Sequence, residues 1–355
     1  MDWAQLGITV GVAVAAFAVW LVSTAMLIWG ERRVVAKMQT RVGPNRLGPG
    51  GVLQTLADGA KLFFKEDIAP TNVDRVVYFA APFVSAVVAM LTFAVIPFGG
   101  TFTLAGREVA LQVWDPNVGL LWFLAMSSLG VYGIVLAGWS SGSKYPLLGG
   151  VRSSAQMISY ELAMGLALAA VFVYNGTLQS SQIVAAQTAS LLGPIPAWNL
   201  VPMAPAFVIF FTAVIAETQR PPFDLPEAEG ELVAGYVTEY SGAKFAMFFL
   251  GEFMNVITVS AVTVTAFLGG PSGPVPAAIE GTVVGALLGV VYFALKVFAF
   301  VFVFIWLRGT LPRMRFERLM DLGWKVMLPL GLLWVLATGF SVIVRQEAPA
   351  PTAFR

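Results

Sequence analysis

The chain has 355 residues, of which 58% are hydrophobic and 12% charged, and its formal net charge is +1. A mean hydropathy of +0.79, with recurrent apolar runs of about 20 residues, indicates a polytopic membrane protein and argues against a water-soluble globular domain. The chain contains no cysteine and no histidine, which are the usual ligands of iron–sulfur clusters, haem, zinc and copper. We therefore expect no metal site and no bound redox cofactor, and the net charge gives no reason to expect a nucleic-acid partner.

Apolar segments predict an all-α fold with about eight transmembrane helices in a single membrane domain, residues 1–345. The predicted spans are 6–29, 77–98, 118–139, 157–174, 200–216, 245–268, 283–307 and 326–344. The first span lacks the basic start and the small-residue cleavage site of a signal peptide, so we interpret it as a retained helix. We expect the tail, residues 346–355, to be disordered.

The first loop, between the first two spans, combines a turn-rich basic stretch with an amphipathic segment. Gly and Pro dominate residues 43–51 and predict tight turns that present Arg41 and Arg46. Apolar residues then recur at three- and four-residue spacing, which predicts a helix lying in the membrane interface; they are Leu53, Leu56, Ala60, Phe63 and Phe64. The loop is equally explained as an anchor to anionic lipid. Its glycine spacing matches neither of the common nucleotide-binding motifs.

Basic residues predict the orientation of the chain. The odd-numbered loops carry seventeen Lys and Arg residues, whereas the even-numbered loops carry only Arg107. Lys and Arg accumulate at the cytoplasmic ends of transmembrane helices. We therefore expect the odd-numbered loops to be cytoplasmic.

Carboxylates near the cytoplasmic membrane boundary are the best candidates for function. Glu217 lies at the end of the fifth span, and Glu161 and Glu252 lie about 6 Å and about 10 Å inside the fourth and sixth spans. Lys296 is placed near the middle of the seventh. Buried carboxylates must be paired, protonated or in contact with water, so this set suggests a path for protons or cations. The alternative is static pairing, of Glu252 with Lys296 and of Glu161 with Arg152 or Lys144.

The loop after the fifth span is rich in acidic residues, namely Asp224, Glu227, Glu229 and Glu231. Asp224 followed by Leu225, Pro226 and Glu227 is typical of a helix start, with Asp224 as the N-cap. Asp224 and Glu227 therefore have a structural explanation that is as good as a functional one. Glu227 and Glu231 repel each other at four-residue spacing on a helix, so this loop is expected to rearrange when a nearby charge changes.

Three stretches resemble a known family. Residues 39–46 (QTRVGPNR), which follow Glu31-Arg32-Arg33 and precede Asp58, are similar to the first cytoplasmic loop of the quinone-site membrane subunit of proton-pumping NADH:quinone oxidoreductase, respiratory complex I. Residues 155–161 (AQMISYE) and 216–229 (AETQRPPFDLPEAE) resemble its fourth helix and its fifth loop. The resemblance extends from the first span to the eighth.

The resemblance implies a role for each candidate residue. Arg33, Arg41, Arg46 and Asp58 would belong to the quinone-site loop, and Asp224, Glu227, Glu229 and Glu231 to a coupling loop. Glu161, Glu217, Glu252 and Lys296 would form the proton path from the quinone cavity. The quinone would be a substrate, and the partners would be lipid, peripheral iron–sulfur and quinone-site subunits, and antiporter-like membrane subunits. The implied location is the bacterial plasma (inner) membrane.

Other functions remain open on the sequence alone. Membrane-bound hydrogenases and other donor-linked complexes contain similar subunits. A stand-alone proton or cation antiporter would also need intramembrane acids and a lysine. A purely structural anchor would need none of the glutamates to be ionisable.

Overall fold

The computed structural model describes residues 3–104, 106–188, 190–192, 195–226, 229–276, 279 and 281–347. The chain is all-α over these residues apart from two short hairpins, and seven of its helices are long and apolar enough to cross a membrane. The long helices are α1 (Trp3–Met38), α3 (Arg75–Phe93), α4 (Gly119–Ser140), α5 (Lys144–Asn175), α9 (Gly242–Phe267), α10 (Val283–Thr310) and the C-terminal helix. The C-terminal helix consists of α11 (Phe316–Asp321), a π-helical segment (Leu322–Met327) and α12 (Leu328–Glu347). This architecture confirms the predicted all-α polytopic membrane protein.

The shorter elements comprise the connections at the two ends of the bundle and one core helix, α7. They are η1 (Pro49–Gly51), α2 (Gln54–Phe64), β1 (Thr101–Leu104), β2 (Arg107–Ala110), α6 (Ser180–Ala186), β3 (Ser190–Leu192), β4 (Ile195–Pro196), α7 (Ala204–Glu217), α8 (Glu229–Leu232) and η2 (Gly235–Val237). The hairpins β1–β2 and β3–β4 are antiparallel, and Thr101 pairs with Ala110 in the first. The predicted helix of the first loop is present as α2, and its Phe63 and Phe64 are exposed.

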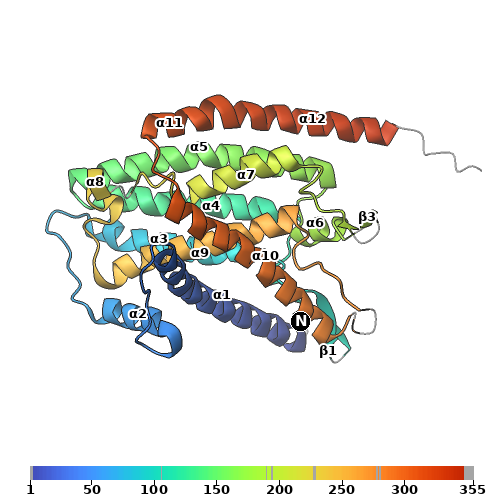
Figure 1. Ribbon diagram of the computed structural model, residues 1–355, viewed down its shortest axis with the longest axis horizontal. Coiled ribbons are helices and arrows are strands. Elements are labelled where there is room, and N and C mark those ends of the chain that lie inside the picture. The colour runs from blue at the N-terminus through green and yellow to red at the C-terminus, as the bar shows by residue number, and fades with distance from the viewer. Residues whose placement is uncertain are drawn as a thin grey trace, which may run out of the picture.

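The helices form a layered bundle (Figure 1). The C-terminal helix lies along α5, which packs on α4 and α7, while α3 packs on α4 and α9. Helix α10 crosses the bundle obliquely against α9 and α1. The end that holds α2 and α8 is called the α2 end below, and the opposite end, with the N-terminus, β1 and α6, is called the β1 end. The largest core cluster contains buried residues from α1, α4, α5, α6, α7, α9, α10 and α11.

Two helices extend further at the α2 end than their apolar runs predict. Helix α1 continues to Met38, nine residues past the predicted end, and α5 begins at Lys144 instead of residue 157. The first turns of α5 are rich in glycine and polar residues, but they are covered by protein: a Cβ at Gly149 would lie 2.7 Å from the Tyr236 nitrogen, and one at Gly150 would lie 3.3 Å from the Gly138 Cα. Close packing of small residues thus supports a helix where hydropathy gives no signal.

Other boundaries also differ from the prediction. Helix α3 ends at Phe93 instead of residue 98, because Pro97 follows and the buried Val95 and Ile96 belong to a turn. The C-terminal helix begins at Phe316, ten residues before the predicted span. It continues to Glu347, so the first two residues of the predicted tail are helical, and residues 348–355 lie outside the described residues.

The shortest of the predicted spans, α7, is a helix of 14 residues and therefore rises about 21 Å, less than the hydrocarbon thickness of a bilayer. Its core-facing residues, such as Phe210 and Ala213, are fully buried by neighbouring helices. One face of α7 is therefore buried in the bundle, while Val208 on another face is exposed, and the C-terminal end of α7, at Glu217, lies inside the protein.

Candidate functional site

An open groove of about 1190 Å³ lies at the α2 end, between α1, the loop after it, α2 and the N-terminal half of α9. Its wall is largely apolar and includes Leu21, Ile28, Phe249 and Phe253. Ionisable side chains line it as well, namely Glu31, Arg32, Arg41, Arg46, Asp58, Lys61 and Arg308. Such a groove suits a ligand with an apolar tail and a polar head.

Three of the four predicted loop residues, Arg41, Arg46 and Asp58, line this groove. Arg33 does not: its Nη1 donates a hydrogen bond to the Gly50 carbonyl at 2.7 Å, and its guanidinium lies 5.3 Å from the centre of the Trp29 ring. Arg33 therefore holds the turn that shapes the groove. That turn also requires Gly51, whose φ is 77° and whose Cβ would meet the Pro44 oxygen at 2.3 Å.

Asp58 is held ionised in the groove wall. Arg32 Nη1 lies 2.5 Å from Asp58 Oδ2, and Gln54 Nε2 donates to Oδ1 at 3.0 Å. Partial burial raises the pKa of Asp58, but these hydrogen bonds and the positive charges of Arg32 and Lys61 outweigh it, so the pKa lies below its ordinary value. The carboxylate thus presents a fixed negative charge to the groove.

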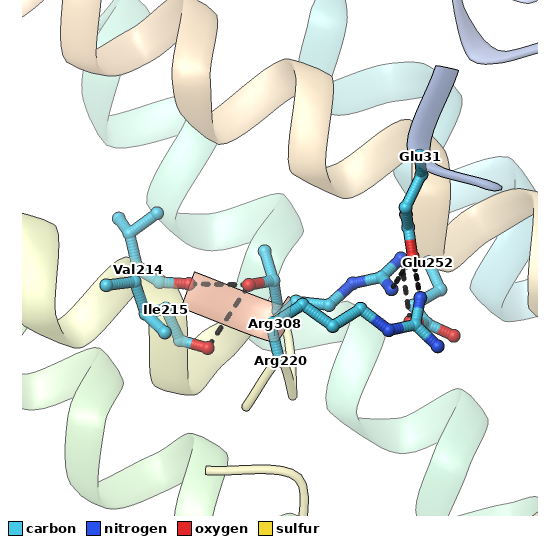
Figure 2. A network of polar contacts seen from close by, with 7 residues as sticks. Glu31, Val214, Ile215, Arg220, Glu252 and Arg308 are labelled. Atoms are coloured by element: carbon cyan, nitrogen blue, oxygen red, sulfur yellow. Dashed lines mark hydrogen bonds and ion pairs between the residues drawn. The ribbon is translucent and has the colours of Figure 1, made fainter. Parts of the chain in front are cut away.

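A buried ion-pair network connects the groove to the interior (Figure 2). Arg220 Nη1 lies 3.5 Å from Glu31 Oε1, its Nη2 lies 3.0 Å from Glu252 Oε1, and Arg308 Nη1 also contacts Glu31. The guanidinium of Arg220 stacks over Phe253, 4.4 Å from the ring centre. Arg220, Glu31 and the Glu252 side chain are 6%, 10% and 19% exposed, so charge balance here depends on the pairing itself.

The turn after α7 places Arg220 in this network. Arg220 N donates to the Ile215 carbonyl at 3.3 Å, and Gln219 adopts a positive φ of 52°, so the chain reverses directly after Glu217. Gln156 of α5 holds the turn by donating to the carbonyls of Ala216, at 2.8 Å, and of Phe223, at 2.9 Å. The same short segment therefore sends Glu217 toward the core and Arg220 toward the groove.

A small, partly open cavity of about 80 Å³ between the helices is lined by both Glu217 and Glu252. Its other polar lining consists of Ser85, Thr92, Ser127, Thr218, Gln219, Tyr236 and Asn255. A cavity of this size and polarity has room for a few water molecules, each of which needs about 10–15 Å³ of such volume. Glu217 Oε1 accepts a hydrogen bond from Ser127 at 2.8 Å, while its Oε2 is buried and has no hydrogen-bond partner among the described residues.

Glu161 of α5 is connected to this region through Ser128, the residue that follows Ser127 in α4. The Ser128 hydroxyl contacts Glu161 Oε1, and Ser127 bonds Glu217, so two consecutive serines hold the two glutamates. The structure thus gathers the three predicted glutamates in one polar region near the middle of the bundle. Arg152, one proposed static partner of Glu161, pairs with Glu231 at 2.7 Å instead.

Lys296 is not brought to the glutamates. Its Nζ donates to the carbonyls of Leu268, Gly270 and Ser272 at 2.8, 2.9 and 2.7 Å, just beyond the C-terminal end of α9. Leu268 is sixteen residues after Glu252, which corresponds to about 24 Å along the helix axis. The static pair between Glu252 and Lys296 is therefore not formed, because Glu252 pairs with Arg220 and Lys296 lies at the β1 end.

The acidic loop differs from its predicted form. Asp224 does not cap a helix starting at Leu225: α8 begins at Glu229, and the Asp224 carboxylate pairs with Arg313 at 3.1 Å. The ion pair of Asp224 with Arg313 thus forms in place of the predicted helix cap. Glu231 pairs with Arg152, Glu229 starts α8, and the predicted Glu227 lies outside the described residues.

Several site residues were not predicted as such. Arg220 and Arg308 counted only as loop charges and Glu31 only as part of a motif, although they build the ion-pair network. In the sequence, these three residues could have been recognised as charged residues that stand close to the end of an apolar run. Ser127 and Ser128 gave no signal, because serine is common in membrane helices, where it bonds its own backbone.

The fold and this region define a class: a polytopic membrane protein in which an ion-pair network links a lateral groove to a small cavity lined by carboxylates. Residues 11–339 match the family model described as NADH dehydrogenase. An NADH-quinone oxidoreductase subunit from Frankia casuarinae is 55% identical over 325 residues, 92% of this chain and 70% of the relative. The subunit of the same name from Frankia alni is 54% identical over 323 residues, 91% of this chain and 70% of the relative. The chain therefore belongs to the NADH dehydrogenase family.

Proposed function

We propose that this chain, as a membrane subunit of NADH-quinone oxidoreductase, forms part of the quinone-binding cavity and couples quinone reduction to proton translocation. The groove at the α2 end would hold the quinone as a substrate, with its tail against the apolar wall and its headgroup near Arg41, Arg46 and Asp58. Electrons would come from peripheral iron–sulfur subunits, because the chain has no cysteine or histidine to hold a redox centre. Antiporter-like membrane subunits would receive the coupling signal.

One observation carries this proposal: a single buried guanidinium, that of Arg220, pairs with Glu31 on the groove wall and with Glu252 on the cavity wall. A quinone that is being reduced gains negative charge until protons reach it. That charge attracts Arg220 and Arg308, weakens the pair with Glu252 and so changes the proton affinity of the carboxylates around the cavity. Glu252, Glu217 and Glu161 would then pass the change toward partner subunits.

Lys296 and the coupling loop keep a place in the proposal as separate elements. Asp224 and Glu231 are held by Arg313 and Arg152, so a charge change at the groove can be transmitted to the loop only through rearrangement of these pairs. Lys296 would support the fold of the β1 end, where three backbone carbonyls hold it, without exchanging a proton itself. The α2 end would face the cytoplasm of a bacterial cell, as the distribution of Lys and Arg supports.

The test uses the assembled complex in membrane vesicles. Glu217→Gln and Glu252→Gln are each expected to lower NADH-driven proton translocation at least about tenfold at unchanged assembly, because glutamine cannot exchange a proton at this position. NADH oxidation, quinone reduction and vesicle acidification are measured together. Wild-type proton translocation in both variants would contradict the proposal.

The antiporter alternative is tested with the chain alone. Purified and inserted into liposomes, a stand-alone antiporter would exchange protons for cations without a redox partner. We expect no such exchange, because the groove and its network respond to a quinone that is reduced only in the complex.

A further inference from the structure

The two serines of α4 hold their glutamates in different surroundings. Glu217 has one oxygen on Ser127 and the other, Oε2, at the cavity that it lines. Glu161 does not line that cavity, and the side-chain hydrogen bond that the structure gives it comes from Ser128. A water molecule that enters the cavity would adapt to a change of charge on Glu217, whereas Glu161 depends on its serine.

Ser128 has two acceptors for one hydrogen. Its hydroxyl lies within hydrogen-bond distance of Glu161 Oε1 and also 3.0 Å from the Leu124 carbonyl, one turn earlier in α4. A serine hydroxyl donates one hydrogen bond and accepts others. Only one of the two acceptors can receive the hydrogen at a time, so the serine has two alternative hydrogen-bond arrangements.

We propose that Ser128 is a positioning residue that keeps Glu161 hydrogen bonded in both of its protonation states. With Glu161 ionised, the Ser128 hydroxyl donates to Oε1. With Glu161 protonated, the carboxyl O–H donates to Ser128 Oγ, and the serine hydrogen turns to the Leu124 carbonyl. The inference rests on the proposed function, since it matters only if Glu161 changes its proton during turnover.

Other polar side chains near Glu161 are engaged elsewhere, so the hydrogen bond to Glu161 depends on the Ser128 hydroxyl. Arg152, nine residues earlier on α5, is engaged by Glu231, and Tyr160 donates its hydroxyl to the Leu319 carbonyl on the C-terminal helix. The nearby titratable group is Glu217 on α7, another carboxyl that cannot donate a positive charge to Glu161. An ionised or protonated carboxyl without a partner in this setting is costly, so loss of the serine hydroxyl disfavours one of the two states.

The experiment compares Ser128→Ala, Ser128→Cys and Ser128→Thr in the assembled complex in membrane vesicles. Alanine removes the hydroxyl, cysteine keeps the shape with a weak donor, and threonine keeps the hydroxyl. We expect the alanine and cysteine variants to translocate protons about five- to tenfold more slowly, and threonine to restore the rate. Ser260→Ala is the matched control, because Ser260 is buried in α9 and bonds the Val256 carbonyl of its own helix.

Infrared difference spectroscopy gives a readout that a general packing defect would not change. The carbonyl band of protonated Glu161 is assigned by its loss in Glu161→Gln. We expect its frequency to shift in the alanine and cysteine variants and to return in the threonine variant. If the alanine variant does not assemble, the cysteine variant reports the loss of the donor.

Two failures are distinguishable. Wild-type rates and an unshifted Glu161 band in Ser128→Ala and Ser128→Cys would overturn the role of Ser128, while a slow Glu161→Gln would still support the proposed function. Wild-type proton translocation in Glu161→Gln itself would instead remove Glu161 from the proposed path.

Discussion

At the β1 end, partly buried charges are surrounded by neutral groups, whereas in the ion-pair network next to the groove at the α2 end they face one another. Lys296 is held by three backbone carbonyls, and Asp115 accepts hydrogen bonds from the side chains of Gln112, Gln179, Ser180 and Ser181. Neutral donors and acceptors of this kind fix one geometry. Arg220 is instead shared between Glu31 and Glu252, beside a cavity that holds a carboxylate oxygen without a protein partner among the described residues. The comparison indicates a rigid β1 end and an α2 end that responds to charge.

The largest effect is expected where the network meets the groove. Glu31→Gln removes a carboxylate that Arg220 and Arg308 share, and loss of one partner from a buried ion pair typically costs about 3–5 kcal/mol. We expect NADH-driven quinone reduction to fall at least about tenfold, measured in membranes with matched amounts of assembled complex. Glu66→Gln is the control, because Glu66 is exposed in the loop after α2. A wild-type rate of quinone reduction in Glu31→Gln would show that the ion-pair network has only a structural role, like the charges at the β1 end.

Lys296→Met tests the rigid end. The change leaves three backbone carbonyls without their donor, which costs up to about 3 kcal/mol each and lowers the midpoint of thermal inactivation. We expect protons translocated per NADH to stay unchanged, with Arg345→Gln as the exposed control. A lower ratio at unchanged assembly would show that Lys296 belongs to the proton path, as the sequence predicted.

Asp115→Asn is expected to have a smaller effect of the same kind. An amide cannot accept all of the hydrogen bonds that the carboxylate accepts, so the junction between the β2–α4 loop and α6 loosens by about 1 kcal/mol. Thermal inactivation is the measurement, and Glu108→Gln, on the exposed face of β2, is the control. Altered coupling without altered stability would contradict the view that this cluster is scaffold.

The smallest effect concerns the groove wall and pH. Asp58 has a pKa below its ordinary value of 3.8, because its bonds to Arg32 and Gln54 and the charges of Arg32 and Lys61 outweigh partial burial. Its ionised form is therefore present above that value and is lost only as the pH falls through the lowered pKa. We expect Asp58→Asn to raise the KM for quinone about threefold, by the same factor at about pH 6 and about pH 8. A factor that changes between these values would mean that Asp58 titrates in the groove.

The sequence predicted the fold well where hydropathy alone decides. Apolar runs located the spans, but they could not show that α5 begins at Lys144, because glycine-mediated packing supports its polar first turns. They also could not show that α3 stops at Phe93, since the buried turn after it is as apolar as the helix.

The site was predictable in part for a related reason. Glu161, Glu217 and Glu252 stand out because ionisable groups are rare in apolar helices. Their partners do not stand out: Arg220 pairs with residues about 190 positions before it and about 30 after it, and no local pattern shows such pairings. Counting residues along the span correctly predicted that Lys296 lies in the middle of α10. It did not predict which residues surround Lys296, because α10 crosses the other helices obliquely.

The most direct test of the central claim measures protons translocated per NADH oxidised by Arg220→Gln complex in sealed vesicles. Arg220 is the connection between groove and cavity, so its loss should leave some quinone reduction but lower the proton ratio well below that of the wild type. A wild-type ratio at a reduced turnover rate would show that Arg220 supports the groove alone and that coupling takes another route.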